Sequence, residues 1–171
     1  MKKIVLIVII AFSSHISFGQ VDKSVENEFQ AEFYASTSQI KKLADSYGIG
    51  IGLDYKTKLF IFGTEIFAIT KGIGGGYESD HYLNIDLLGG IHKKYGKFDI
   101  SLSSGIGLSI RDEGEDSWIE TEEKYAKLGI PLRIKVNYIV NDKFLIGIGG
   151  YSSFTSSVDI YSLLFSIGYR F

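Results

Sequence analysis

The sequence predicts an all-β protein, an eight-stranded antiparallel up-and-down transmembrane β-barrel, and three observations predict it. Large apolar residues alternate with small or charged residues along eight segments, which is the period of a strand with two different faces. The segments run about ten to fifteen residues, against about five or six in water-soluble sheets, and are long enough for a tilted strand to cross a bilayer. Their connections alternate between short and long, as in transmembrane barrels.

The first four segments establish the alternation. Residues 27–37 alternate Phe and Ala with Glu and Gln, and residues 47–56 alternate Tyr, Ile and Leu with Gly. Residues 81–92 alternate Leu and Ile with Asn, Asp and His. Residues 59–70 are ambiguous because both faces carry large apolar side chains. One face holds Phe60, Phe62, Ile66 and Ala68, and the other holds Glu65 together with Ile61, Phe67 and Ile69.

The last four segments continue the pattern. Residues 98–110 alternate Phe, Ile and Leu with Asp, Ser and Gly, and residues 144–153 alternate Phe and Ile with Leu, Gly and Tyr. Residues 126–138 include Pro131, which predicts a bulge or local irregularity because proline cannot donate a ladder hydrogen bond. Residues 161–171 end the chain on alternating Tyr, Leu, Phe and Ile, with Leu164 as the one exception.

The connections predict two different ends of the barrel. The short ones are Thr57-Lys58, the KKYG turn at residues 93–96 and the VND turn at residues 140–142. Short turns on the side of both termini and longer loops on the other side are typical of transmembrane barrels. The longer connections are polar or Gly-rich and lie near residues 38–46, 71–80, 111–124 and 154–160.

The distribution of residue sizes predicts which face meets lipid. One face carries the large apolar residues throughout, whereas the other carries Gly, Ser and charged residues. The interior of an eight-stranded barrel is just wide enough for side chains to fill it. The face with small and charged residues is therefore predicted to line the lumen. Closure of the barrel gives every backbone N–H and C=O group in the hydrocarbon a hydrogen-bond partner. A soluble barrel or sandwich is the alternative.

Residues 1–19 are predicted to be a secretory signal peptide, with basic residues before an apolar stretch and small residues that allow cleavage between Gly19 and Gln20. The alternative is a membrane anchor, but the apolar stretch is well short of roughly 20 residues. Because Gln20 is not Cys, lipoprotein anchoring there is excluded. Residues 20–26 are expected to form a short N-terminal periplasmic segment, and residues 27–171 the barrel.

The composition excludes several classes of function. The chain has 18 Lys and Arg against 20 Asp and Glu, so no basic excess points to nucleic acid. It has no Cys, which excludes disulfides and thiolate metal sites. The separated His81 and His92 make no metal site, and no cofactor is expected. The Gly-rich residues 71–79 lack the Gly-Lys-Ser/Thr of a phosphate loop.

The C-terminal IGYRF is similar to the closing strand of small OmpX/OmpA-type outer-membrane β-barrels of Gram-negative bacteria, a porin-like family that the mature chain resembles in architecture. The resemblance implies an outer-membrane location, contact with its lipid and lipopolysaccharide, and a monomer. It also implies that the barrel-assembly machinery reads the last strand, although Ser166 replaces a Gly often found there. The residues of this assembly signal are Phe165, Gly168, Tyr169 and Phe171.

Charged residues on the small-residue face predict a polar plug. The carboxylates come from the first five segments and the cations from the sixth and eighth, which predicts one acidic and one basic wall. Buried charges must pair or cost several kcal/mol each, so salt bridges across the lumen are expected, with Arg133 as the central donor. A selective ion path is the alternative. The predicted network comprises Glu32, Asp54, Glu65, Asp86, Asp99, Lys127, Arg133, Lys135 and Arg170.

Catalytic candidates are few. The SDHYLN stretch at residues 79–84 resembles the His-x-Ser-Asn motif of lipid A deacylases, in which Ser is the nucleophile and His its base. Leu83 occupies the Ser position and removes that nucleophile. His92, beside Lys93 and Lys94 at a short turn, is expected to be a solvated interfacial residue.

The loop at residues 111–124 carries seven carboxylates without the spacing of an EF-hand. It is expected to be a solvated extracellular loop. Recruitment of divalent cations that bridge lipopolysaccharide phosphates, or contact with a partner through Trp118, is the alternative. Taken together, the sequence favours a non-enzymatic envelope-structural or surface-interaction protein, with a lipid-modifying enzyme and a small-solute pore as the alternatives.

Overall fold

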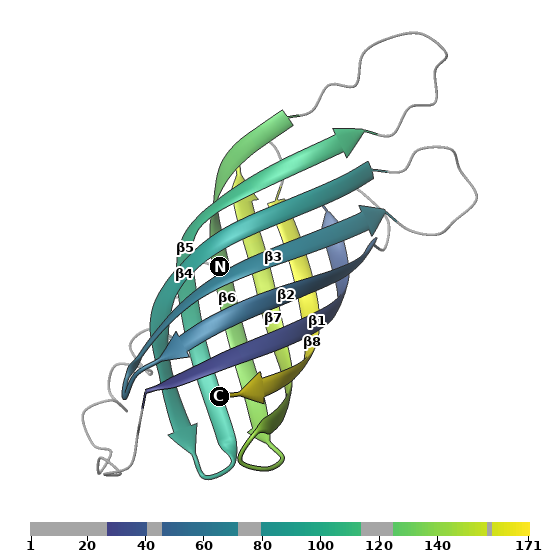
Figure 1. The fold of residues 1–171 in the computed structure, drawn as a ribbon. Coiled ribbons are helices and arrows are strands. Elements are labelled where there is room, and N and C mark those ends of the chain that lie inside the picture. The colour runs from purple at the N-terminus through teal and green to yellow at the C-terminus, as the bar shows by residue number, and fades with distance from the viewer. Residues whose placement is uncertain (1–26, 41–45, 72–79, 114–124, 157–158) are drawn as a thin grey trace, which may run out of the picture.

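In the computed structural model, eight strands form one closed barrel in which neighbours follow the order of the chain (Figure 1). The structure describes residues 27–40, 46–71, 80–113, 125–156 and 159–171. The predicted signal peptide and most of the long loops therefore lie outside the described residues. The strands are β1 (Glu28–Ile40), β2 (Ser46–Lys56), β3 (Phe60–Lys71), β4 (Asp80–Tyr95), β5 (Phe98–Glu113), β6 (Tyr125–Ile139), β7 (Phe144–Thr155) and β8 (Asp159–Arg170).

Every neighbouring pair of strands is antiparallel, and β8 closes the barrel against β1. The closing register runs from Gln30 opposite Arg170 to Ile40 opposite Ile160. The predicted fold class is thereby confirmed. Backbone pairing continues beyond the alternating side chains, because the ladder does not depend on side-chain polarity. β4 and β5 consequently reach 16 residues each and extend past the predicted segments.

The short turns lie together at the lower end of the barrel in Figure 1, where β8 also ends. They comprise residues 57–59, 96–97 and 140–143. Gly96 has a φ of 59°, a left-handed conformation that glycine adopts without steric cost. The β7–β8 connection is shorter than the predicted 154–160, because β7 continues to Thr155 and β8 begins at Asp159.

The two faces of the barrel differ as the alternation predicted. In β2, every second residue is buried and the residues between them are exposed, except for the half-buried Tyr55. Large apolar side chains are exposed on all eight strands, up to 72% for Leu128. The described residues include no helix that is both long and apolar enough to span a membrane.

The interior holds larger side chains than the sequence predicted. Phe67, Tyr151, Leu164 and their neighbours form a buried apolar cluster inside the barrel, so the ambiguous third segment has large residues on both faces. Glycines on adjacent strands make room for such rings. At Gly52, a Cβ would lie 2.5 Å from the Tyr34 hydroxyl. An eight-stranded barrel has to be filled by side chains, and bulky residues opposite glycines achieve this.

Pro131 lies at the predicted irregularity. The β5–β6 pairing passes from Ser104 opposite Leu132 directly to Gly107 opposite Gly129, and the register is the same on both sides. The ladder is therefore interrupted opposite Pro131 without the extra residue of a bulge. The Ser104 hydroxyl donates a hydrogen bond of 2.7 Å to the Pro131 carbonyl and bridges the interruption.

Candidate functional site

Arg133 on β6 is the centre of the lumen charge network. Its Nη2 lies 2.8 Å from Asp54 Oδ1 on β2, and its Nη1 lies 2.8 Å from Glu65 Oε2 on β3. Nε donates to the Ser103 hydroxyl and Nη1 also donates to Tyr34, at 3.2 and 3.3 Å. The guanidinium thus crosses the barrel and joins two carboxylates on strands that do not neighbour its own. Arg133 was predicted as the central donor, and these buried ion pairs lie inside the lumen.

Lys135 extends the network from the next inward position of β6. Its Nζ lies 2.8 Å from Glu32 Oε1 and 3.0 Å from Asp54 Oδ2. The Asn137 amide donates a 2.9 Å hydrogen bond to the same Glu32 oxygen. Each of the two Asp54 carboxylate oxygens therefore contacts one cation, Oδ1 the Arg133 guanidinium and Oδ2 the Lys135 ammonium. These ion pairs join β1, β2, β3 and β6, and the opposite charges compensate one another in the buried interior.

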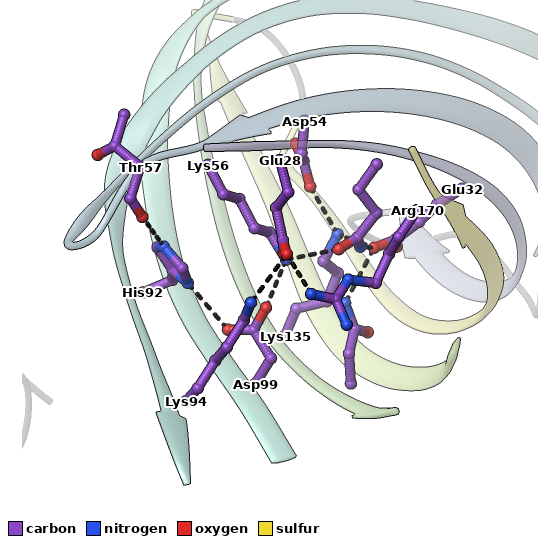
Figure 2. Close-up of polar contacts among 12 residues, drawn as sticks. Glu28, Glu32, Asp54, Lys56, Thr57, His92, Lys94, Asp99, Lys135 and Arg170 are labelled. Carbon is purple, nitrogen blue, oxygen red and sulfur yellow. Dashed lines mark hydrogen bonds and ion pairs between the residues drawn. The ribbon is translucent and has the colours of Figure 1, made fainter. Parts of the chain in front are cut away.

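A second cluster lies nearer the short turns, as Figure 2 shows. Lys56 Nζ lies 2.6 Å from Asp99 Oδ2 and donates to Gln30 at 2.7 Å. His92 Nδ1 lies 3.0 Å from the other Asp99 oxygen, and its Nε2 lies 2.6 Å from the Thr57 carbonyl oxygen. The Nε2 nitrogen must donate to that carbonyl. His92 is 2% exposed, so the expected solvated interfacial histidine is wrong: β4 continues to Tyr95 and carries His92 into the lumen.

A third group closes the rim of the barrel at the short-turn end (Figure 2). Glu28 Oε2 accepts from Lys94 Nζ at 2.8 Å and also contacts Arg170 Nη2. These side chains are more exposed than those of the inner clusters. They join β1, β4 and β8, so the seam between the first and last strands has an ionic contact at its lower end.

Asp86 on β4 differs from the other buried carboxylates. It accepts a 2.7 Å hydrogen bond from Tyr151, and none of the described cations forms an ion pair with it. Glu65 lies directly opposite it in the β3–β4 register. One oxygen of each carboxylate, and both amide atoms of the nearby Asn84, have no hydrogen-bond partner among the described residues.

The structure brings together most but not all of the predicted network. Glu32, Asp54, Glu65, Arg133 and Lys135 form one cluster, whereas Asp99 belongs to the second group and Arg170 to the rim. Lys127 is half-buried and forms no ion pair with the described part of the chain.

Four ion-pairing residues of these clusters were missed by the sequence interpretation: Glu28, Lys56, His92 and Lys94. The prediction of separate acidic and basic walls is wrong. Lys56 lies on β2 with the buried carboxylate Asp54, and Lys94 lies on β4 with the buried carboxylate Asp86. Lys56 is two residues after Asp54, and Lys94 is two residues after His92. The alternation could have placed both lysines inside the barrel.

Three of the predicted assembly-signal residues lie in β8, and Phe171 directly follows its last residue. Phe165 and Phe171 are exposed on the outer face, and the Tyr169 ring packs 5.2 Å from Phe144 and 5.0 Å from Phe171 between ring centres. Gly168 is buried on the inner face. The rings contribute to an aromatic belt at the short-turn end, which is typical of the membrane–water interface.

The deacylase-like stretch does not form a catalytic group. His81 and Leu83 are exposed on the outer face, whereas Asn84 is buried inside. Among the described residues, the side-chain partner of His81 is the Thr70 hydroxyl, 3.3 Å from Nδ1. Among the described residues, no three His, Asp or Glu side chains gather in a group that could hold a metal ion. The acidic loop around Trp118 lies outside the described residues.

Comparison with known proteins places this geometry among solved barrels. No protein-family model matches the sequence, and no curated protein matches it. The attachment invasion locus protein Ail of Yersinia pestis matches with a TM-score of 0.66 and 14% identity, over 85% of this chain and 99% of Ail. Neisserial surface protein A matches with a TM-score of 0.64 and 12% identity, over 86% of this chain and 98% of its own. The fold is that of an eight-stranded outer-membrane β-barrel.

The same outer-membrane barrel fold also carries an enzyme. The outer membrane enzyme PagL matches with a TM-score of 0.56 and 12% identity, over 79% of this chain and 97% of PagL. At these identities the comparisons show the fold alone. Function therefore has to be argued from the side chains of this barrel.

Proposed function

We propose that the protein is a non-enzymatic integral outer-membrane barrel with an envelope-structural or surface-interaction role, whose lumen is closed by charged side chains. The observation that carries this proposal is the cross-lumen bridging by Arg133 and Lys135. To pass through the lumen, an ion would have to break these ion pairs, whose side chains are almost fully buried. Breaking a buried pair is costly, so the network acts as a plug instead of a conduction path.

Planar-bilayer recording of the refolded full chain tests the plug. We expect no steady conductance under conditions in which a porin inserted into the same bilayer conducts. Steady unitary currents of the wild-type chain would contradict the proposal and favour the small-solute pore. Insertion is verified in parallel by flotation of the protein with vesicles, so that missing currents are not mistaken for missing protein.

The alternative of a lipid-modifying enzyme is supported by the fold shared with PagL and by the contact between His81 and Thr70. The missing serine at Leu83 argues against it. Mass spectrometry of lipopolysaccharide acyl chains after incubation with the protein tests this alternative. We expect unchanged acyl chains. Release that disappears in a His81→Ala variant would replace the structural role by an enzymatic one.

We further propose that the outward rings of β8 are read by the barrel-assembly machinery. Their exposure on the last strand supports this role, since Phe171 is 76% exposed. A Phe171→Ser variant is expected to accumulate less folded protein in the outer membrane, as measured by heat-modifiable migration. Phe33→Ser, which removes another exposed ring from β1, is the matched control. Equal losses in both variants would indicate a general hydrophobic effect and contradict the signal.

A further inference from the structure

His92 is a buried histidine whose two ring nitrogens both face oxygen atoms that accept hydrogen bonds. Nδ1 lies 3.0 Å from Asp99 Oδ1, and Nε2 lies 2.6 Å from the Thr57 carbonyl oxygen (Figure 2). The other Asp99 oxygen lies 2.6 Å from Lys56 Nζ, a cation that favours the ionised carboxylate. A neutral imidazole has one N–H and can donate to only one of these oxygens, whereas an imidazolium donates to both.

The backbone of β4 fixes the ring in this position. The His92 N–H donates to the Leu59 carbonyl at 3.0 Å, so that His92 holds the β2–β3 turn at two carbonyl groups, those of Thr57 and Leu59. Among the charged groups of the described residues, Asp99 is the one in direct contact with the ring. The others that surround it are Lys56 on β2 and the rim group of Glu28, Lys94 and Arg170 on β1, β4 and β8.

The charge balance of the lumen points to the same protonation state. Lys56 donates to Gln30 and the Gln30 amide donates to Glu32, so the group around Asp99 is linked to the central cluster. Unbalanced charge is costly in a buried interior. Without His92, the linked side chains carry three positive and four negative charges, and an imidazolium makes the two numbers equal. The cations are Lys56, Arg133 and Lys135, and the carboxylates are Glu32, Asp54, Glu65 and Asp99.

From these contacts we propose that His92 is a proton-binding site, at which a second ring proton forms an imidazolium that latches the β2–β3 turn to Asp99 on β5. Loss of this proton leaves a nitrogen lone pair facing either the carboxylate or the Thr57 carbonyl, so that one hydrogen bond is lost and a buried acceptor is left without its donor. The stability that the latch contributes is therefore present while both nitrogens carry protons, and it is lost as the pH rises and one proton leaves. This inference goes beyond the proposed envelope role and does not depend on whether the lumen conducts.

Two-bond ¹H–¹⁵N correlation spectra of the refolded full chain, labelled with ¹⁵N-histidine, test the site directly. Protonated and unprotonated ring nitrogens have well-separated ¹⁵N shifts, and the spectrum of His92→Gln assigns the ring signals. The measurement is made at about pH 7.5, where an imidazole in a model peptide is mostly neutral. We expect both His92 nitrogens to be protonated. An unprotonated nitrogen on His92 at this pH would overturn the proposal.

Asp99→Asn tests whether the carboxylate holds the second proton. The amide nitrogen of an asparagine can donate to Nδ1, so His92 should then have a single protonated nitrogen at the same pH. The matched control is Asp86→Asn, which neutralises another buried carboxylate of the lumen without touching the ring. This control should leave both nitrogens protonated. Loss of the second proton in both variants, or in neither, would contradict the latch.

The pH dependence of stability provides a second measurement. Urea unfolding of the wild type and of His92→Gln is compared from about pH 6 to about pH 8.5, the range around the ordinary titration of histidine. The midpoint of the wild type should fall relative to that of His92→Gln as the pH rises, and His81→Gln should follow the wild type. Parallel profiles of wild type and His92→Gln would overturn the latch. If His92→Gln does not fold, the ring spectra of the wild type, Asp99→Asn and Asp86→Asn decide between the same two outcomes.

Discussion

Single side chains in the lumen have unequal energetic roles. Arg133 contacts two carboxylates from different strands, and the planar guanidinium, with its fixed array of donors, suits such a geometry better than an ammonium would. Among the described residues, Asp86 accepts a hydrogen bond only from the Tyr151 hydroxyl. The stability of the barrel should therefore depend strongly on some charges and little on others.

Arg133→Met removes the central cation and leaves Asp54 and Glu65 with weaker compensation. The free energy of unfolding should fall by about 3–5 kcal/mol, as expected when one member of a buried ion pair is lost. Urea unfolding in lipid vesicles measures this change. Lys127→Met is the control, because Lys127 forms no ion pair with the described residues. Identical transition midpoints for wild type and Arg133→Met would contradict the network.

Asp86→Asn should leave the free energy of unfolding unchanged or raise it. The amide oxygen can still accept from Tyr151, and a buried charge opposite Glu65 disappears. Glu65→Gln removes a charge that pairs with Arg133 and should cost about 1–3 kcal/mol. The same urea experiment compares the two variants. A loss for Asp86→Asn as large as that for Glu65→Gln would show that Asp86 has a stabilising partner.

At the level of strands, β4 shows how close packing depends on the face. A Cβ at Gly90 would lie 2.1 Å from the Leu102 carbonyl oxygen of β5. At the adjacent Gly89, no atom lies within 4 Å of an added Cβ. Two neighbouring glycines thus have different reasons to be present, and only Gly90 is required by its surroundings.

Gly90→Ala should therefore destabilise the barrel by about 1–3 kcal/mol, because backbone atoms have to move to relieve the overlap. Gly89→Ala should change the free energy of unfolding by less than about 0.5 kcal/mol. Thermal unfolding of the two variants in the same detergent provides the comparison. Similar melting temperatures for both would indicate that the β4–β5 pair adjusts freely.

For the whole molecule, the decisive property is the medium that each face meets. Leu102 and Ile134 are opposite each other on the outer face of β5 and β6. Large apolar side chains are exposed on every strand, Ile134 among them. They belong in contact with lipid, because leaving so large an apolar surface in water would be unfavourable.

Spin labels at Leu102 and Ile134 should report collisions with oxygen dissolved in hydrocarbon and little contact with a water-soluble relaxing agent. A label at Lys58, in an exposed turn, should report water. Electron spin resonance of the protein in vesicles makes both measurements. Water contact at Leu102 or Ile134 would contradict the membrane-spanning arrangement.

The period of two in the sequence predicted the strands, their order and the face of most side chains. It placed Glu32, Asp54 and Arg133 in the lumen because each occupies a position of the small-residue face. It could not select partners across the barrel, since these depend on strand tilt and stagger. His92 was misjudged because the length of β4 follows from backbone pairing and not from side-chain alternation.

The distribution of the network along the chain has a consequence for biogenesis. Glu32, Asp54 and Glu65 precede Arg133 and Lys135 by many residues, and their contacts span the barrel. In a curled sheet that has not yet closed, these ionised groups lack their partners, and the hydrocarbon core of a bilayer solvates them poorly. We therefore expect the nascent polypeptide to stay hydrated on its concave side until the cylinder is complete, so that entry into the bilayer coincides with ring closure.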